Sequence, residues 1–226
     1  MSDSEFFREV NEAVRQDRYK ALWDKYGVYV LVGAVLLVAG VAAFKAWTYW
    51  QQHEAEDAGA RFSQALTLEA GGDQAKAREM LAALAEQGPQ GYATLARFQL
   101  AASEAKAGET DKAVASYDAL AKDAKVDAIL QGYATIQAAS LRLAAADYAE
   151  MEGRLKGLTD SDSAWRFSAR ELLGLSAYRL NNMAEAEKQF SALVGDQGTP
   201  TNLRERADMM LALLVGAPQA LSTTPK

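Results

Sequence analysis

Few side chains in this chain could carry acid–base, nucleophilic or metal chemistry, and those few stand alone. His53 is the single histidine, and there is no cysteine. The absence of cysteine excludes disulfides, thiolate metal ligands and cysteine nucleophiles. A metal site needs several nitrogen, oxygen or sulfur ligands that converge on one point, so a lone histidine on a helix is expected to be solvated. The sequence therefore predicts no metal and no other cofactor.

The closely spaced acidic residues are typical of solvated surface, with a carboxylate pair of a hydrolase as the rarer alternative. They form two groups, Glu54/Glu56/Asp57 and Asp160/Asp162. The run Gly71-Gly72-Asp73 lacks the preceding strand of a phosphate-binding loop. No G-x-S-x-G, Walker or H-E-x-x-H motif occurs. The sequence predicts a binding module and not an enzyme, without a small-molecule substrate; activity in purified residues 51–226 would contradict this.

The element that must position any binding surface is an apolar stretch near the N-terminus. Residues 26–44 form a run of 19 without a charge, and a membrane-spanning helix needs about 17–25 such residues. We therefore expect residues 26–45 to form a transmembrane helix. Amphipathic rings that favour the membrane interface flank the stretch on both sides. They are Trp23 and Tyr26 at its N-terminal end, and Trp47, Tyr49 and Trp50 after it.

Two other interpretations of this stretch are a buried core helix and a cleaved signal peptide. Core helices rarely run this long without a polar residue. The apolar region of a signal peptide has about 7–15 residues and follows a short basic segment, whereas 25 residues precede this longer run. The pattern favours an uncleaved anchor with a single span.

The distribution of basic residues predicts the orientation of that span. Residues 1–25 contain five Lys and Arg residues, and the 20 residues after Phe44 contain two. By the positive-inside rule, residues 1–25 stay in the cytoplasm and the C-terminal part crosses the membrane. Residues 2–20 begin with a capping-box spacing and place apolar residues on one helical face. We expect a short amphipathic helix there, which binds either lipid or a cytoplasmic partner.

The composition after the span restricts the choice of partners. The whole chain carries a net charge of −6, and basic residues are not clustered beyond the span. A nucleic-acid partner requires such clusters, so none is expected. An acidic surface is also a poor match for anionic lipid. Membrane contact is therefore expected through the single span, with proteins as the partners of the translocated part.

A repeat of helix pairs organises the remainder of the chain. Alanines recur at intervals of 36, 36 and 37 residues, a large side chain follows most of them by four positions, and a small residue precedes most of them by twelve. This spacing resembles the tetratricopeptide repeat, a helix–turn–helix unit. An ordinary alanine-rich bundle is the alternative. The four sets are Ala65/Ala77/Leu81, Ala101/Ala113/Tyr117, Gln137/Ala149/Gly153 and Gly174/Ala186/Phe190.

The third set lacks both the small first residue and the large last one, so the third unit is expected to be irregular or shifted in register. Breaks are expected at 71–72, 87–91, 122–127, 159–163 and 195–202. The predicted fold class is all-α: one transmembrane helix, then a right-handed tetratricopeptide-like solenoid of about four helix pairs in residues 46–216. A capping helix over residues 202–216 and a flexible tail at 217–226 complete it.

The first helices of successive pairs line the concave face of such a solenoid. Partner-binding residues are therefore expected among the side chains that the repeat places there. Core packing is the competing interpretation for the apolar ones, and packing of the aliphatic stem along the surface is the competing one for the arginines. The candidates are Phe62, Leu66, Phe98, Arg142, Glu171, Tyr178 and Arg179.

The order of these parts resembles the YfgM-like family, the ancillary subunit of the bacterial SecYEG translocon. The resemblance is sharpest over residues 44–52, which contain the aromatic string Ala46-Trp47-Thr48-Tyr49-Trp50. It implies a bacterial inner-membrane protein with a periplasmic domain and no catalytic residues. The implied partners are translocon subunits and a membrane-anchored periplasmic chaperone, in the handover of secreted proteins. The alternative is a scaffold for another envelope assembly, such as outer-membrane protein insertion or cytochrome maturation.

Overall fold

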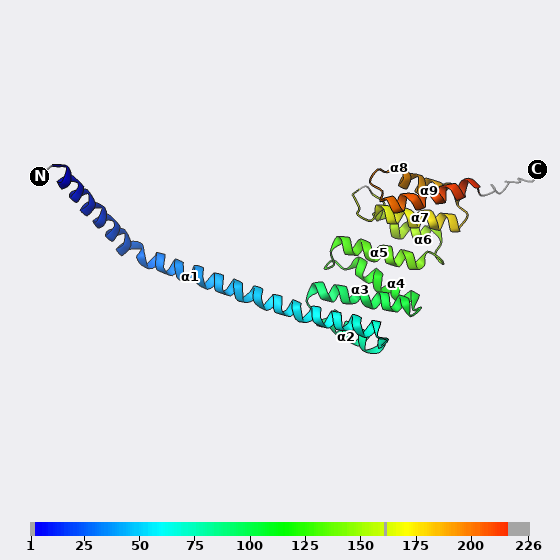
Figure 1. The fold of residues 1–226 in the computed structure, drawn as a ribbon, viewed down its shortest axis with the longest axis horizontal. Helices are drawn as coiled ribbons and strands as arrows, with labels where there is room; N and C mark the ends of the chain where they lie inside the picture. The colour runs from blue at the N-terminus through cyan, green and yellow to red at the C-terminus, as the bar shows by residue number, and fades with distance from the viewer. Residues whose placement is uncertain (1–2, 161, 217–226) are drawn as a thin grey trace, which may run out of the picture. The chain divides into compact units, whose positions relative to one another are not determined.

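The computed structural model describes residues 3–160 and 162–216, with the backbone alone for residues 3–19, 21 and 22. All regular elements in this part of the chain are helices, labelled in Figure 1. The predicted flexible tail at 217–226 lies outside the described residues. The helices are α1 (Asp3–Ala70), α2 (Gln74–Gln87), α3 (Gln90–Lys106), α4 (Thr110–Lys122), α5 (Ala128–Arg142), α6 (Tyr148–Leu155), the 3-10 helix η1 (Lys156–Leu158), α7 (Arg166–Arg179), α8 (Met183–Gly195) and α9 (Thr201–Gly216).

The chain divides into two compact units, Met1–Asp57 and Ala58–Lys226. The first unit is the N-terminal part of α1. Its backbone is helical through residues 3–26 without a break, because no Gly or Pro interrupts that segment. The amphipathic face expected over residues 2–20 involves side chains that lie outside the described ones.

The apolar part of α1 exposes its side chains. Val28, Leu37 and Phe44 are 71%, 68% and 66% exposed, so the alternative of a buried core helix is wrong. Within the described residues, α1 is the one helix long and apolar enough to cross a membrane. Exposed apolar surface of this length is stable in hydrocarbon and unfavourable in water.

The second unit is a stack of four helix pairs followed by a single helix. The pairs are the C-terminal end of α1 with α2, α3 with α4, α5 with α6, and α7 with α8, and α9 packs on α8. The expected stop at Gly71-Gly72 is confirmed: α1 ends at Ala70, and Gly72 has a φ of 90° that favours glycine. Asp73 then caps α2 by accepting a hydrogen bond from the amide of Lys76.

The small and large residues of the repeat meet inside the first, second and fourth pairs. Ala65, Ala77 and Leu81 are each 1% exposed, and Ala101 and Ala113 are completely buried. In the fourth pair, Gly174 lies against Phe190, whose ring would be 2.8 Å from a Cβ added to the glycine. The tetratricopeptide-like architecture expected from the spacing is therefore confirmed in these pairs.

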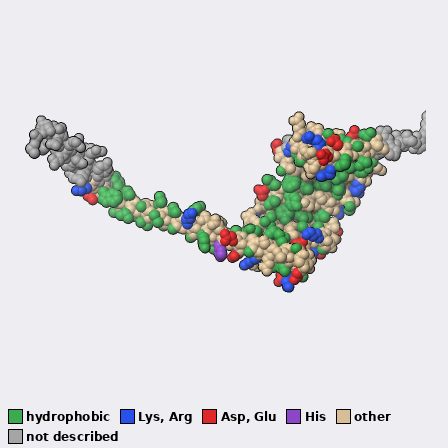
Figure 2. Space-filling model, in the orientation of Figure 1, with side chains coloured by type: hydrophobic (Ala, Val, Ile, Leu, Met, Phe, Trp, Pro, Cys, Tyr) green, Lys and Arg blue, Asp and Glu red, His purple; other side chains and the backbone are tan. Residues whose placement is uncertain are grey.

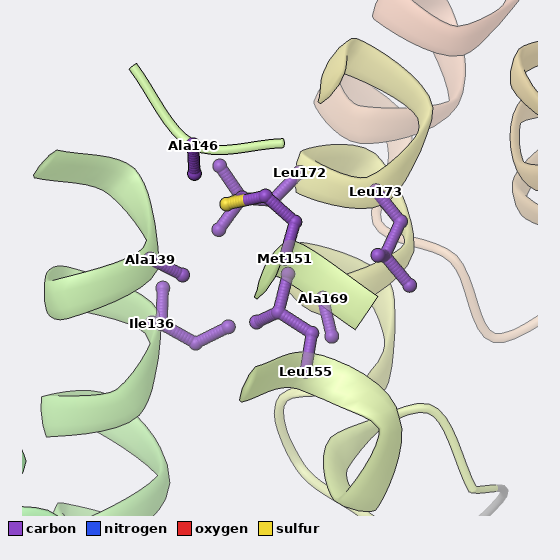
Figure 3. Packing of buried hydrophobic residues seen from close by; sticks show 8 residues of the cluster. All are labelled: Ile136, Ala139, Ala146, Met151, Leu155, Ala169, Leu172 and Leu173. Carbon is purple, nitrogen blue, oxygen red and sulfur yellow. The ribbon is translucent and has the colours of Figure 1, made fainter. Parts of the chain in front are cut away.

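The third pair keeps the same spacing with a register shifted by two residues. Ala139, Met151 and Leu155 are buried, whereas Ala149 and Gly153 are exposed. Figure 3 shows the shifted residues together with Leu172 and Leu173 of α7. The shift begins in the connection from α4 to α5, which has five residues (123–127) where the connection from α2 to α3 has two (88–89). Because of the extra residues, the buried positions of α5 and α6 fall two residues later in the sequence than the repeat pattern predicts.

Candidate protein-binding surface

Five uncharged side chains gather on the first helices of the second and third pairs and at the start of α7. Leu95, Ile129 and Tyr133 are 43%, 60% and 36% exposed. Phe98 and Trp165 are half-buried. Figure 2 shows hydrophobic side chains gathered over α5 and the helices beside it. We call this set, Leu95, Phe98, Ile129, Tyr133 and Trp165, the aromatic surface.

Its three rings form a continuous row from α3 to α7. The ring centroids of Phe98 and Tyr133 are 5.5 Å apart, and those of Tyr133 and Trp165 are also 5.5 Å apart. Both pairs are tilted, at 43° and 39°, within the distance range of favourable aromatic contacts. Phe98 also contacts Tyr117 of α4, at 6.1 Å. One end of the row therefore contacts the core through Phe98, while Tyr133 in the middle of the row is exposed to solvent.

Trp165 is fixed in place from both its polar and its apolar side. It is the residue that precedes α7, and its indole Nε1 donates a 2.8 Å hydrogen bond to the carbonyl of Ile129. Its ring lies so close to Gly132 that an added Cβ there would be 2.3 Å from Cδ1 of Trp165. Glycine at position 132 is therefore what allows the indole to lie on α5.

The charged residue next to Phe98 in the sequence is paired within the chain. Arg97 of α3 and Asp123 form a 2.6 Å ion pair. The hydrogen bond from Arg97, helped by the amide of Lys125, holds the pKa of the Asp123 carboxyl below its usual value. The aromatic surface thus offers apolar area and ring faces without a charge that demands a charged ligand.

Sequence reasoning placed one of these five residues, Phe98, among its candidates. The repeat pattern does not predict Ile129 and Tyr133, because the register of the third pair is shifted by two residues, and it does not predict Trp165, which lies just before α7. Leu95 lies in the regular second pair, and the pattern does not single it out either. The sequence does carry a signal for them: Gly132-Tyr133 within α5 is an unexpected glycine in a helix, of the kind that marks close packing.

The other uncharged candidates lie in the first and fourth pairs. Phe62 is half-buried in the core cluster of α1, α2 and α3, with its ring centroid 6.3 Å from that of Tyr92. Leu66, one turn along α1, is 37% exposed. Tyr178 is half-buried against the cluster of α7, α8 and α9. Phe62 and Tyr178 therefore have packing roles in addition to any contact with a partner.

The charged candidates join helices of the stack. Arg142 donates from Nε to Glu150 at 2.9 Å and lies 3.7 Å from Asp111. Glu171 accepts a 2.7 Å hydrogen bond from Arg206 of α9, and Arg179 donates to the carbonyl of Ala146. Their charges and donors are used within the chain, which the sequence pattern had no means to indicate.

The expected interface residues of the membrane span lie on α1 of the first unit. Trp23 and Tyr26, at the N-terminal end of the apolar run, are 62% and 48% exposed. After it, Trp47, Tyr49 and Trp50 are 58%, 73% and 56% exposed, and the centroids of the two tryptophan rings are 5.7 Å apart. Their spacing along the helix is that of two aromatic belts.

No constellation for metal binding exists among the described residues, since no three His, Cys, Asp or Glu side chains converge. A stack of helix pairs that presents uncharged rings from adjacent first helices is the architecture of a protein-interaction scaffold. The comparison with known protein families also identifies the family within this class of scaffolds. A family model for the tetratricopeptide repeat-like domain matches residues 20–214, and the chain belongs to this family. No curated protein and no solved structure matches the chain.

Proposed function

We propose that the protein is a membrane-anchored periplasmic adaptor, which binds translocon subunits, periplasmic chaperones or both during the handover of secreted proteins. The observation that carries this proposal is the aromatic surface, an uncharged row of rings on adjacent helices of a repeat scaffold. Such rigid amphipathic rings are the side chains that dominate protein interfaces. Repeat domains of this kind are typically scaffolds without catalytic activity.

The membrane helix supports the same proposal. Anchoring the scaffold on one span confines it to the layer next to the membrane, which raises its effective concentration for partners in that membrane. Weak contacts at the aromatic surface then suffice. The excess of basic residues before the span supports a cytoplasmic N-terminus and a periplasmic scaffold in the bacterial inner membrane. Protease added to spheroplasts should remove the scaffold; protection of residues 58–216 would contradict this orientation.

The partner is tested by site-specific photocrosslinking in cells. A photoreactive phenylalanine at Tyr133 lies on the aromatic surface, and the same group at Glu187 lies on the exposed face of α8. We expect translocon or chaperone subunits to crosslink at Tyr133 and not at Glu187. Subunits of an outer-membrane insertion or cytochrome maturation assembly at Tyr133 would favour the alternative scaffold. Equal, unselective crosslinking at both positions would contradict a role for the aromatic surface.

A further inference from the structure

We propose that the outer face of α9 is a second docking site, which takes an amphipathic helix of a partner polypeptide where the repeat would place a second helix. α9 lies at the C-terminal end of the stack, beside α8 (Figure 1). A terminal helix of a solenoid usually has a polar outer face, but Met209, Leu213 and Val215 are 60%, 55% and 89% exposed. We define the outer face of α9 as the exposed residues Glu205, Asp208, Met209, Ala212, Leu213 and Val215. It shares no residue with the aromatic surface, so the two sites depend on separate observations.

The buried face of α9 follows the pattern with which the other first helices pack on the preceding pair. In α3, α5 and α7, a completely buried alanine belongs to the core cluster of the preceding pair, and a small residue follows it five positions later. In α9, Ala207 is 1% exposed and belongs to the cluster of α7 and α8. The four sets are Ala96/Ala101, Ala134/Ala139, Ala169/Gly174 and Ala207/Ala212. α9 is therefore built as the first helix of a fifth pair.

The small residue that a second helix covers in the other pairs is exposed in α9. Ala101 and Ala139 are completely buried, and Gly174 lies against the ring of Phe190. Ala212 has the equivalent position and is exposed, and no second helix follows α9 among the described residues. An apolar helix face without a cover is unfavourable in water. The other pairs of the chain thus show what covers such a face, which is a helix.

The second helices of the stack also show which side chains that helix must carry. In α2, α4 and α8, a buried alanine is followed by a large buried residue four positions later and by a buried leucine three positions after that. These sets are Ala77/Leu81/Leu84, Ala113/Tyr117/Leu120 and Ala186/Phe190/Leu193. In α8 the large residue is the one that lies against the small residue of the first helix. A partner helix with the stripe small-x-x-x-large-x-x-Leu therefore complements Ala212.

Two carboxylates on the outer face select the charge of the partner helix. Glu205 and Asp208 are exposed, and neither has an ion-pair partner among the residues that the structure describes. The arginines of α9 do not compensate them, because Arg206 is paired with Glu171 and Arg204 donates to backbone carbonyls of the preceding loop. Lysine or arginine beside the apolar stripe is the complementary feature of the partner.

The test uses the full chain in nanodiscs of zwitterionic lipid, with empty discs as the blank. The probe is a fluorescent peptide, stapled as a helix on its solvent side, which carries the stripe Ala-x-x-x-Phe-x-x-Leu with lysines beside it. One control peptide has the same composition in scrambled order, and the other has glutamates in place of the lysines. We expect saturable binding of the probe and none of the scrambled peptide. The glutamate peptide should bind about fivefold more weakly, the size of two exposed ion pairs.

Substitutions on the outer face give the decisive comparison. Ala212→Leu occupies the space that the large side chain of the probe needs, and should weaken binding about tenfold. Ala83→Leu, at an exposed position of α2, should leave binding unchanged. Glu205→Gln combined with Asp208→Asn should remove the preference for lysines, whereas Glu79→Gln, exposed on α2, should preserve it. Unchanged binding to Ala212→Leu, binding of the scrambled peptide or equal binding of the lysine and glutamate peptides would overturn the proposal.

Two other occupants of the outer face are distinguished by further variants. Removal of residues 217–226 should leave the affinity for the probe unchanged; a large increase would show that this segment of the chain covers the face, and would overturn the proposal. A photoreactive phenylalanine at Leu213 should crosslink in cells to a different polypeptide, within a segment that has the apolar stripe and flanking basic residues. A crosslink to a second copy of this chain, or to a segment without the stripe, would overturn the proposal.

Discussion

In the fourth helix pair, Asn181 lies in the turn between α7 and α8 with a φ of 63°, and Gly174 lies against the ring of Phe190. In the third pair, the turn between α5 and α6 has no described residue with positive φ, and α6 has 8 residues where α8 has 13. Both pairs nevertheless bury an apolar set at the spacing of the repeat. The comparison shows that burial at this spacing, and not the identity of the small residues, is what defines a pair.

The largest expected effect comes from a substitution in the third pair that distinguishes the observed register from the one that the sequence pattern suggests. Leu155→Ala removes a fully buried side chain of the third pair, and we expect a loss of about 2–5 kcal/mol in the free energy of unfolding. Gly153→Ala at the exposed position should be neutral or stabilising by up to about 1 kcal/mol, because alanine favours helix. Urea unfolding followed by circular dichroism measures both. If Gly153→Ala lowered the free energy of unfolding more than Leu155→Ala does, position 153 would be the buried one and the register would not be shifted.

A second pair of substitutions compares two glycines directly. Gly174→Ala places a methyl group against the buried ring of Phe190, so we expect a net loss of about 1–2 kcal/mol. The same change at Gly153 meets open space. If both variants unfold at the wild-type urea concentration, the fourth pair is packed more loosely than its geometry indicates.

These contrasts show which features the sequence could predict. The end of α1 at Gly71-Gly72, the helix pairs and the terminal helix α9 follow from local signals: apolar periodicity, glycine stops and the recurrence of small residues. The register of the third pair does not: the expected break at 122–127 matches the observed connection at 123–127, but it does not show which residues of α5 and α6 face the core, because that depends on how α5 packs on α4. The aromatic surface was largely missed for the same reason.

Local sequence signals also could not predict which charged side chains form ion pairs. Arg154 and Asp118 are separated by 36 residues, and Arg206 and Glu171 by 35, so each ion pair joins helices one repeat apart. A repeating sequence predicts that such positions are neighbours only after the register is known. The role of Trp165 required the hydrogen bond to Ile129, which likewise crosses from one pair to the next.

The third prediction concerns acid stability, where the ion pairs of the third pair should matter most. Two arginines lower the pKa of Glu150 from 4.5 to about 2. Because the folded-state pKa is depressed, the stabilisation is complete above pH 4.5 and is lost as the pH falls towards 2. Since the carboxylate is partly exposed, we expect it to contribute about 1 kcal/mol.

The measurement is urea unfolding at pH 6 and at pH 2.5 for the wild type and for Glu150→Gln. The variant should be less stable at pH 6, and its disadvantage should shrink at pH 2.5. Glu187→Gln, an exposed position of α8, is the matched control and should follow the wild type at both pH values. A constant difference between Glu150→Gln and wild type at the two pH values would show that the network is not coupled to the ionisation of Glu150.

The smallest expected effect lies in the turns themselves. Asn181 adopts a left-handed conformation, so Asn181→Gly should stabilise the fourth pair by about 0.5 kcal/mol or less. In the third pair, Ala144 does not have a positive φ, and Ala144→Gly should destabilise it by about 0.5–1 kcal/mol, because glycine increases the freedom of the unfolded chain. Thermal unfolding of the two variants should therefore move in opposite directions. A shift of the same sign in both would mean that the two turns impose the same backbone requirement.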